Sequence, residues 1–183
     1  MEWEYNEKDL IKRAKNGNNE SLSHLIHHHY NYIYNYLLKM TMEPNLAADL
    51  TQDTCLKIIK KINLYSQDKS AFSTWIIQIA INTYRDHYRK SKRKLNFFNS
   101  LRNSKKEDDL EFDVSNNSFE FISDSMIDLK NTLSKIEPIY KEVILLKYYY
   151  GYEQKEIAEI LNIPVGTVKS RLSNGLKLIR EGL

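Results

Sequence analysis

A polar face near the end of the sequence carries residue types that can contact nucleic-acid bases. In IPVGTVKSRLSNGLKLIR, residues 163–180, the apolar residues that recur at helical spacing are Val168, Leu172, Leu176 and Ile179. Between them lie Lys169, Ser170, Arg171, Ser173, Asn174 and Lys177. Asparagine can pair with adenine through two hydrogen bonds, serine is adaptable, and lysine reaches guanine or phosphate. The pattern predicts either a helix that reads base edges or a terminal helix with a solvated polar face.

The residues before this segment favour the first alternative, because they suit a helix-turn-helix. EQKEIAEIL, residues 153–161, predicts a short helix separated from the next one only by NIP. Asn162 tolerates a left-handed turn, Pro164 suits a helix entrance, and the small Ala158 allows the two helices to approach closely. We expect a small core of Ile157, Leu161, Ile163, Val168 and Leu172. In such a motif the second helix enters the major groove of duplex DNA.

A second polar stripe lies on the predicted helix FSTWIIQIAINTYRDHYRKSKRK, residues 72–94. Its members Gln78, Asn82, Arg85, Arg89 and Arg93 recur every three or four residues. Such a stripe can follow a phosphate backbone, and its amides can bond base edges. The preceding loop offers Tyr65, an aromatic residue able to stack on an unpaired base. The alternative is a solvated helix end whose basic residues are favoured by the helix dipole.

These stripes require helices to hold them, and the hydrophobic spacing predicts helices almost throughout. We expect helices over 7–16, 20–40, from Pro44 to about Ile62, and over 72–94, followed in the second half by 126–136, a helix from Pro138 that ends at Gly151, and the pair above. We expect Leu50, Cys55, Ile58, Ile59 and Ile62 to form one buried stripe, and Phe72, Trp75 and Ile79 to be core. The fold class is therefore all-α.

Charge divides the chain into two small helical domains joined by a flexible acidic linker. The net charge is +3 overall, but it is +5 over residues 1–94, −5 over 95–128 and +3 over 129–183. We expect domains at 1–94 and 126–183 and a linker at 95–125. Two basic lobes suit nucleic acid, and the acidic linker would avoid duplex DNA.

Cysteine use and hydropathy bear on the cellular compartment. The single cysteine, Cys55, excludes an internal disulfide and fits a reducing, cytoplasmic setting. The polar N-terminal residues do not resemble a signal peptide, and no apolar run approaches the roughly 20 residues that span a bilayer. We therefore expect no direct membrane insertion, so a membrane connection would come through another protein.

Three stretches in fixed order make the chain resemble a bacterial sigma factor of the extracytoplasmic-function group, in the sigma-70 family. They are ADLTQDTCLKIIKKI, FSTWIIQIAINTYRDHYRK and KEVILLKYYYGYEQKEIAEILNIPVGTVKSRLSNGLKLIR, and the linker separates the last two. The resemblance covers nearly the whole chain. It implies region 2 in the first domain, region 4 in the second, and promoter-specific transcription initiation with core RNA polymerase. It implies no enzyme activity of the chain's own and no cofactor.

The same resemblance implies a role for individual residues. Asp49, Gln52 and Asp53 match positions that contact the clamp helices of the polymerase β′ subunit, and the β subunit is a further partner. Tyr65 and Asn82 match the pocket for a base flipped from the −10 element, with Arg85 and Arg89 beside that strand. The family positions that face the −35 element are matched by Lys169, Ser170, Arg171, Ser173, Asn174 and Lys177. The linker matches a segment that threads toward the RNA exit channel. An anti-sigma factor, often membrane-anchored, is a further implied partner.

Some residues depart from the family pattern, and two other functions are compatible with the sequence. The positions of Ser173 and Asn174 often carry larger residues or arginine in this family, and Gly175 costs a helix about 1 kcal/mol relative to alanine. We therefore expect an altered −35 preference. One alternative is a helix-turn-helix regulator that binds operators without polymerase. Another is a metal-dependent helical enzyme built on His24, His27 and His28, although nothing supplies further ligands at the usual spacing.

Overall fold

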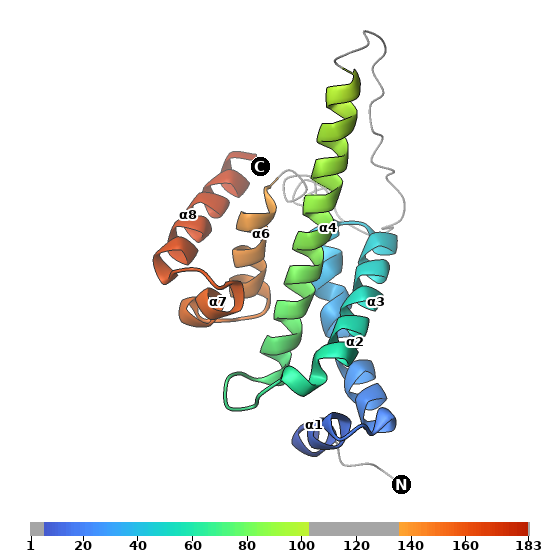
Figure 1. Cartoon of the computed structure of the whole chain (residues 1–183). Helices are drawn as coiled ribbons and strands as arrows, with labels where there is room; N and C mark the ends of the chain where they lie inside the picture. The colour runs from blue at the N-terminus through green and yellow to red at the C-terminus, as the bar shows by residue number, and fades with distance from the viewer. Residues whose placement is uncertain (1–5, 103–135, 183) are drawn as a thin grey trace, which may run out of the picture.

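The computed structural model describes residues 6–102 and 136–182, which form two packed groups of helices (Figure 1). We call α1 to α4, with the short η1, lobe one, and α6 to α8, with η2, lobe two. No strand occurs within these described ranges, so the all-α prediction is confirmed. Residues 126–135 of the predicted helix 126–136 and most of the predicted linker lie outside the described residues.

Lobe one begins with three helices whose ends are set by local chemistry. α1 spans Glu7–Lys15, α2 Asn19–Thr41 and α3 Pro44–Lys61. The side chain of Asn18 accepts a hydrogen bond from the Ser21 backbone at 2.7 Å, which satisfies a free N–H at the start of α2. Met42 ends α2 in the left-handed conformation, at φ 57°, and Pro44 opens α3. The short helix η1, Ile62–Leu64, then leads into the loop before α4.

α4 spans Phe72–Arg102 and therefore runs past residue 94, where we expected the linker to begin. Residues 95–102 contain no glycine or proline to stop the helix. The first half of α4 packs in the core, whereas its second half projects beyond the other helices (Figure 1). The basic residues at positions 89–94 are accordingly exposed.

Lobe two contains α6, Pro138–Ile144, the π-helical turn η2, Leu145–Tyr149, then α7, Gln154–Leu161, and α8, Val165–Gly182. Gly151 adopts φ 75° just after η2, close to the helix end predicted there. Ile157, Leu161, Val168 and Leu172 are buried as predicted, and Ile163 packs partly buried against them. Ala158 is also buried.

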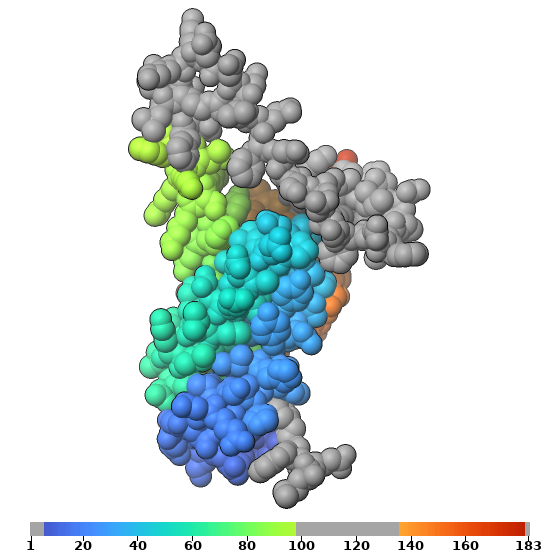
Figure 2. All heavy atoms as spheres, turned by 90° about the vertical axis from the view of Figure 1, so that its right-hand side faces the viewer, coloured from blue at the N-terminus to red at the C-terminus, as the bar shows by residue number. Residues whose placement is uncertain are grey.

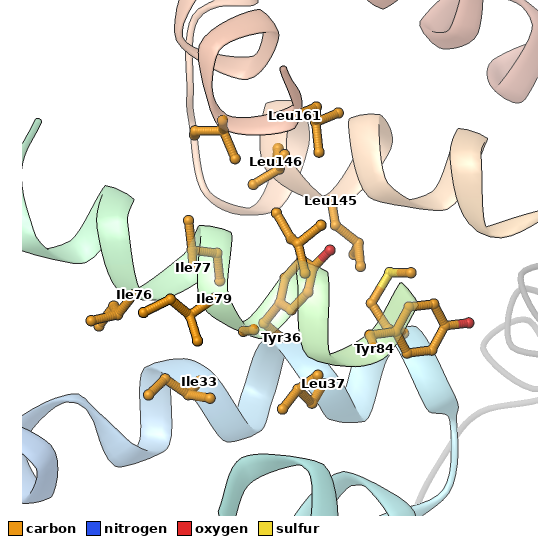
Figure 3. Packing of buried hydrophobic residues seen from close by; sticks show 14 of the residues in the cluster. Ile33, Tyr36, Leu37, Ile76, Ile77, Ile79, Tyr84, Leu145, Leu146 and Leu161 are labelled. Carbon is orange, nitrogen blue, oxygen red and sulfur yellow. The ribbon is translucent and has the colours of Figure 1, made fainter. Parts of the chain in front are cut away.

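The two lobes share one hydrophobic core, which the sequence pattern did not predict. Figure 3 shows Leu145, Leu146 and Leu161 of lobe two facing Tyr36 of α2 and Ile77 of α4. Leu146, Tyr36 and Ile77 are all fully buried. Direct contacts join α4 to α7 and α2 to α6. The position of each lobe's functional faces is therefore set by the other lobe.

Candidate nucleic-acid interface

The polar face of α8 is open in this structure. Lys169, Ser170, Ser173, Asn174 and Lys177 are exposed, and Arg171 is half-buried. Lys177 has only a loose ion pair with Glu181, at 3.6 Å between Nζ and Oε1, with both side chains largely exposed. Exposed pairs of this kind contribute little, so they do not prevent contact with DNA. The predicted base-reading residues thus form one accessible surface.

The turn before α8 has the geometry that a helix-turn-helix needs. Asn162 adopts the left-handed conformation at φ 53°, as predicted, and the Ile163 N–H donates to the carbonyl of Ala158 at 3.0 Å. A capping box begins α7, with the Glu153 N–H donating to Oε2 of Glu156 at 2.6 Å. These contacts hold α7 and α8 in fixed orientation, with the polar face of α8 directed away from the core.

The polar stripe of α4 is divided between solvent and lobe two. Asn82 and Arg89 are exposed, as a nucleic-acid contact requires. Arg89 pairs with Asp86 one turn earlier, with 2.6 Å between Nη2 and Oδ1. That hydrogen bond, assisted by the charge of Lys57, lowers the pKa of the Asp86 carboxyl. The pair is exposed, so a phosphate can replace the carboxylate at little cost.

Arg85, in contrast, is held by lobe two. Its Nε and Nη2 atoms donate to the two carboxylate oxygens of Glu142 at 2.8 and 2.6 Å. The Glu142 side chain is 1% exposed and that of Arg85 is 30% exposed. The hydrogen bond to Glu142 raises the pKa of Arg85 despite its burial. Gln78 of the same stripe also contacts lobe two, because its Nε2 donates to the carbonyl of Glu159 at 3.3 Å.

Tyr65 does not lie where a base could stack on it, because the residue is only 3% exposed. It packs edge-on against Phe72 and tilted against Trp75, and its hydroxyl donates to the carbonyl of Ser70 at 2.9 Å. In this conformation Tyr65 supports the loop from inside. The exposed residues of that loop are Gln67, Asp68, Lys69 and Ala71. The sequence spacing identified the loop correctly but could not show that its aromatic residue turns inward.

A second candidate binding surface lies on α3. Asp49, Gln52 and Asp53 are exposed on one face, which continues into Leu56 and Ile59, 53% and 42% exposed. Ile59 was predicted to be buried, whereas Leu50, Ile58 and Ile62 are buried as expected and Cys55 is half-buried. Figure 2 shows α3 at the surface, on the side of lobe one opposite to lobe two. We call the surface formed by these exposed residues the α3 face: Asp49, Gln52, Asp53, Leu56 and Ile59.

The structure brings no metal site together at the histidines. Across the ranges described, no group of three or more His, Cys, Asp or Glu residues has the geometry to hold a metal ion. His29 instead joins α1 to α2 through Glu7, with 2.9 Å between Nε2 and Oε2. Burial lowers the pKa of His29, and the hydrogen bond to Glu7 opposes that shift. Nor does any helix in the described ranges have the length and apolarity to cross a membrane.

Sequence reasoning missed the residues that join the lobes. Tyr32 of α2 and Tyr152 of lobe two share a hydrogen bond between their hydroxyls at 2.9 Å, and the Tyr150 hydroxyl donates to the Tyr32 carbonyl at 3.3 Å. Lys39 of α2 lies over the ring of Tyr149, with its Nζ 3.9 Å from the ring centroid. The run KYYYGY, residues 147–152, could have indicated these contacts. Four tyrosines so close together are more than one small helical domain can pack into its own core.

Two regions of the chain match known protein families. Residues 25–94 match the family described as Sigma-70 region 2, and residues 126–179 match Sigma-70, region 4. The chain is 28% identical over 180 residues to the ECF RNA polymerase sigma factor SigW of Bacillus subtilis (strain 168), covering 96% of both chains. It is 25% identical to the ECF RNA polymerase sigma-E factor of Haemophilus influenzae, covering 99% of this chain and 97% of that one.

Solved structures show the same fold. The sigma factor RpoE of Bartonella quintana, in complex with the anti-sigma factor NepR, superposes with a TM-score of 0.67 at 22% identity, covering 84% of this chain and 90% of that one. CnrH, in complex with the cytosolic domain of CnrY, superposes with a TM-score of 0.65 at 20% identity, covering 96% and 95%.

Proposed function

We propose that this chain directs promoter-specific transcription by binding polymerase, the −10 element and the −35 element with three separate surfaces. The chain belongs to the sigma-70 family and is a sigma factor of the extracytoplasmic-function group. The observation that carries the proposal is the presence, on one chain, of an open helix-turn-helix face, a polar α4 stripe and an uncovered α3 face. We assign residues 1–94 to polymerase and −10 binding and 126–183 to −35 binding, and we assign 95–125 to a linker whose first residues, 95–102, continue α4.

The polar face of α8 reads the −35 element in the major groove. Asn174 and Ser173 contact base edges, and Lys169, Ser170, Arg171 and Lys177 contact bases or phosphates beside them. The exposed position of these side chains and the fixed turn at Asn162 support this assignment. Direct base contacts provide the specificity, and the lysines provide a salt-dependent share of the affinity.

The α3 face binds core polymerase at the clamp helices of the β′ subunit, and the β subunit contributes further contacts. Asp49, Gln52 and Asp53 provide hydrogen-bond acceptors and negative charge, and Leu56 and Ile59 provide apolar area. A polar surface with an apolar centre is typical of a specific interface. Lobe two leaves this face uncovered, so the free chain can bind polymerase before its lobes separate.

The α4 stripe then holds the unpaired −10 strand. Asn82 bonds a base turned out of the stack, and Arg85 and Arg89 bind the phosphates beside it. Tyr65 shapes the neighbouring loop from the core, and the exposed loop residues close the pocket from outside. Breaking duplex stacking costs about 1.4 kcal/mol per step, which a few captured bases can offset. The polymerase performs the catalytic chemistry.

An anti-sigma factor is a further expected partner. Two of the superposed structures are sigma factors in complex with anti-sigma proteins, and in one the partner is a cytosolic domain. A membrane-anchored anti-sigma factor would provide a membrane connection that the helices of residues 6–102 and 136–182 do not supply. The chain itself is expected to act in the cytoplasm, where the polymerase is.

A regulator that binds operators without polymerase is the competing function. The two are separated by transcription with purified core RNA polymerase on a library of genomic fragments. We expect transcripts only when this chain is added, starting downstream of a shared two-part sequence. If the chain gave no promoter-dependent transcript with core and instead bound a duplex operator tightly alone, the sigma function would be wrong.

A further inference from the structure

The free chain is closed at the surface that must receive DNA. Arg85 is a predicted −10 contact and Gln78 lies on the same polar stripe of α4, and both are bonded to lobe two. Asn82 and Arg89 of this stripe are exposed. The −35 surface on α8 and the α3 face remain open. Closure thus affects one binding surface and leaves the other two accessible.

The carboxylate of Glu142 binds the guanidinium of Arg85 in the way that a phosphate would. A carboxylate and a phosphate both accept two parallel N–H bonds from a guanidinium, and the Arg85–Glu142 contact is of this two-pronged kind, at 2.8 and 2.6 Å. Glu142 is almost fully buried, so water does not weaken its hold on the arginine. One guanidinium cannot make both contacts, so the carboxylate and the DNA strand must compete for it.

We propose that Glu142 is an intramolecular competitor for promoter DNA, which withholds Arg85 in the free chain and must release it before the −10 strand can be held. The proposal rests on the function proposed above for the α4 stripe. The contact of Arg85 with the −10 strand can form only in the open chain, so this contact provides free energy that favours separated lobes.

Other contacts across the interface add to closure. The Tyr32–Tyr152 hydroxyl bond, the Tyr150 bond to the Tyr32 carbonyl and the contact of Lys39 with Tyr149 all join the lobes. Apolar packing adds more, since Leu146 is fully buried beside lobe one (Figure 3). Closure is therefore specific in its geometry and is not a loose collapse of two domains.

Two buried polar groups oppose closure and keep it reversible. Tyr36 is fully buried, and its hydroxyl has no hydrogen-bond partner among the residues described. Lys141 is 4% exposed and donates to the carbonyl of Met40 at 3.3 Å, and no carboxylate among the described residues pairs with its ammonium. Both groups would regain water when the lobes separate, so closure costs their hydration. An interface with such opposing contributions suits a switch rather than a permanent assembly.

The test measures lobe separation and DNA binding in the same variants of the full chain. Fluorophores are attached to cysteines introduced at the exposed residues Asn31 of α2 and Lys155 of α7, after Cys55→Ser removes the native thiol. Energy transfer between them reports closure. Unlabelled chains are titrated with a short single-stranded DNA oligonucleotide of mixed sequence over a range of salt concentrations. The variants are Glu142→Gln, Arg85→Ala and the control Glu153→Gln.

Glu142→Gln should lower the closed-to-open ratio by about tenfold or more, because it removes one charge of a buried pair. It should also tighten binding of the oligonucleotide and steepen the salt slope by about 0.7, the value for one more phosphate contact on a single strand. Arg85→Ala should open the chain as well, without that gain in DNA binding. Glu153→Gln makes the same change in charge at a carboxylate that is 76% exposed and pairs with Lys147 within lobe two, and it should leave energy transfer as in the parent chain.

The results separate this proposal from the one it rests on. If Glu142→Gln kept the parent's energy transfer and its helical circular dichroism, the competitor role of Glu142 would be overturned. If Glu142→Gln opened the chain but left the salt slope of the control, the DNA role of Arg85 would fail and Glu142 would remain only an interlobe contact. Opening together with a steeper slope supports both proposals.

Discussion

Gly175 of α8 lies directly against Ile144 of α6. A Cβ atom built at position 175 would lie 2.7 Å from Cδ1 of Ile144 and 3.1 Å from Cβ of Tyr140, both closer than ordinary contact. The glycine is therefore explained by packing, because it lets α8 cross α6 at close range. The sequence alone indicated only its cost to the helix and suggested that it bears on −35 preference, whereas the structure places it on the buried side, away from the DNA face.

We predict that Gly175→Ala destabilises the chain by about 1 kcal/mol, because overpacking costs about 1–3 kcal/mol and exceeds the gain in helix propensity. Urea unfolding followed by circular dichroism measures this change. Gly166→Ala is the matched control on the same helix, since a Cβ there meets open space, and it should stabilise the chain by about 0.4–1 kcal/mol. Adding Ile144→Val to Gly175→Ala should recover part of the loss, because it removes Cδ1. Equal stability of the two alanine variants would contradict the packing argument.

Closure should depend on pH through Lys141. Burial lowers its pKa from the usual 10.5 to about 8, and opening returns it to water. The open chain therefore binds more protons between these values, so the closed-to-open ratio should rise with pH above 8, by at most about tenfold per pH unit. Below pH 8, Lys141 is protonated in both the closed and the open chain, so the cost of burying its charge opposes closure in full.

Energy transfer between the lobes, measured from pH 7 to 9.5, tests this dependence. Tyr36 and Tyr84 have pKa values raised by burial, that of Tyr84 to about 12, so their ionisation in the open chain would favour opening near pH 10 and sets the upper limit of the range. Lys141→Met should favour closure and remove the rise. A rise that persists in Lys141→Met would assign the effect to another group.

The α3 face should decide polymerase binding. Asp53→Arg reverses a charge at its centre and should weaken binding to core polymerase by about tenfold or more, in competition with the parent chain. Glu20→Arg makes the same charge reversal at an exposed residue of α2 outside this face and should bind like the parent. Unchanged competition by Asp53→Arg would remove this residue from the interface.

Asn174 should determine one base of the −35 element. We expect Asn174→Arg to change the preferred base at that position from adenine toward guanine, since arginine pairs with guanine and asparagine with adenine. Selection of bound duplexes from a randomised −35 library by the reconstituted holoenzyme measures the preference. A preference that stayed the same in the variant would mean that Asn174 faces the DNA backbone or solvent.

Much of this architecture follows from local pattern, and the exceptions have physical causes. The left-handed turn at Asn162 and the exposed α8 face depend on neighbouring residues, and both were predicted correctly. Ile59 was expected to be buried but is exposed, because hydrophobic spacing does not decide which of two adjacent helix faces meets another helix. Tyr65 was expected to be accessible to a base but is buried. The Arg85–Glu142 pair joins residues 57 positions apart, and only tertiary contact could reveal it.

The α4 stripe is proposed to hold an unpaired −10 strand, and permanganate reactivity of promoter thymines tests whether it does. Holoenzyme with the parent chain should make thymines near −10 reactive. Asn82→Ala should lose most of this reactivity while duplex binding through α8 changes little, because Asn82 contacts only the flipped base. If Asn82→Ala reduced duplex binding and thymine reactivity equally, or reduced neither, the α4 stripe would not be the site that holds the −10 strand.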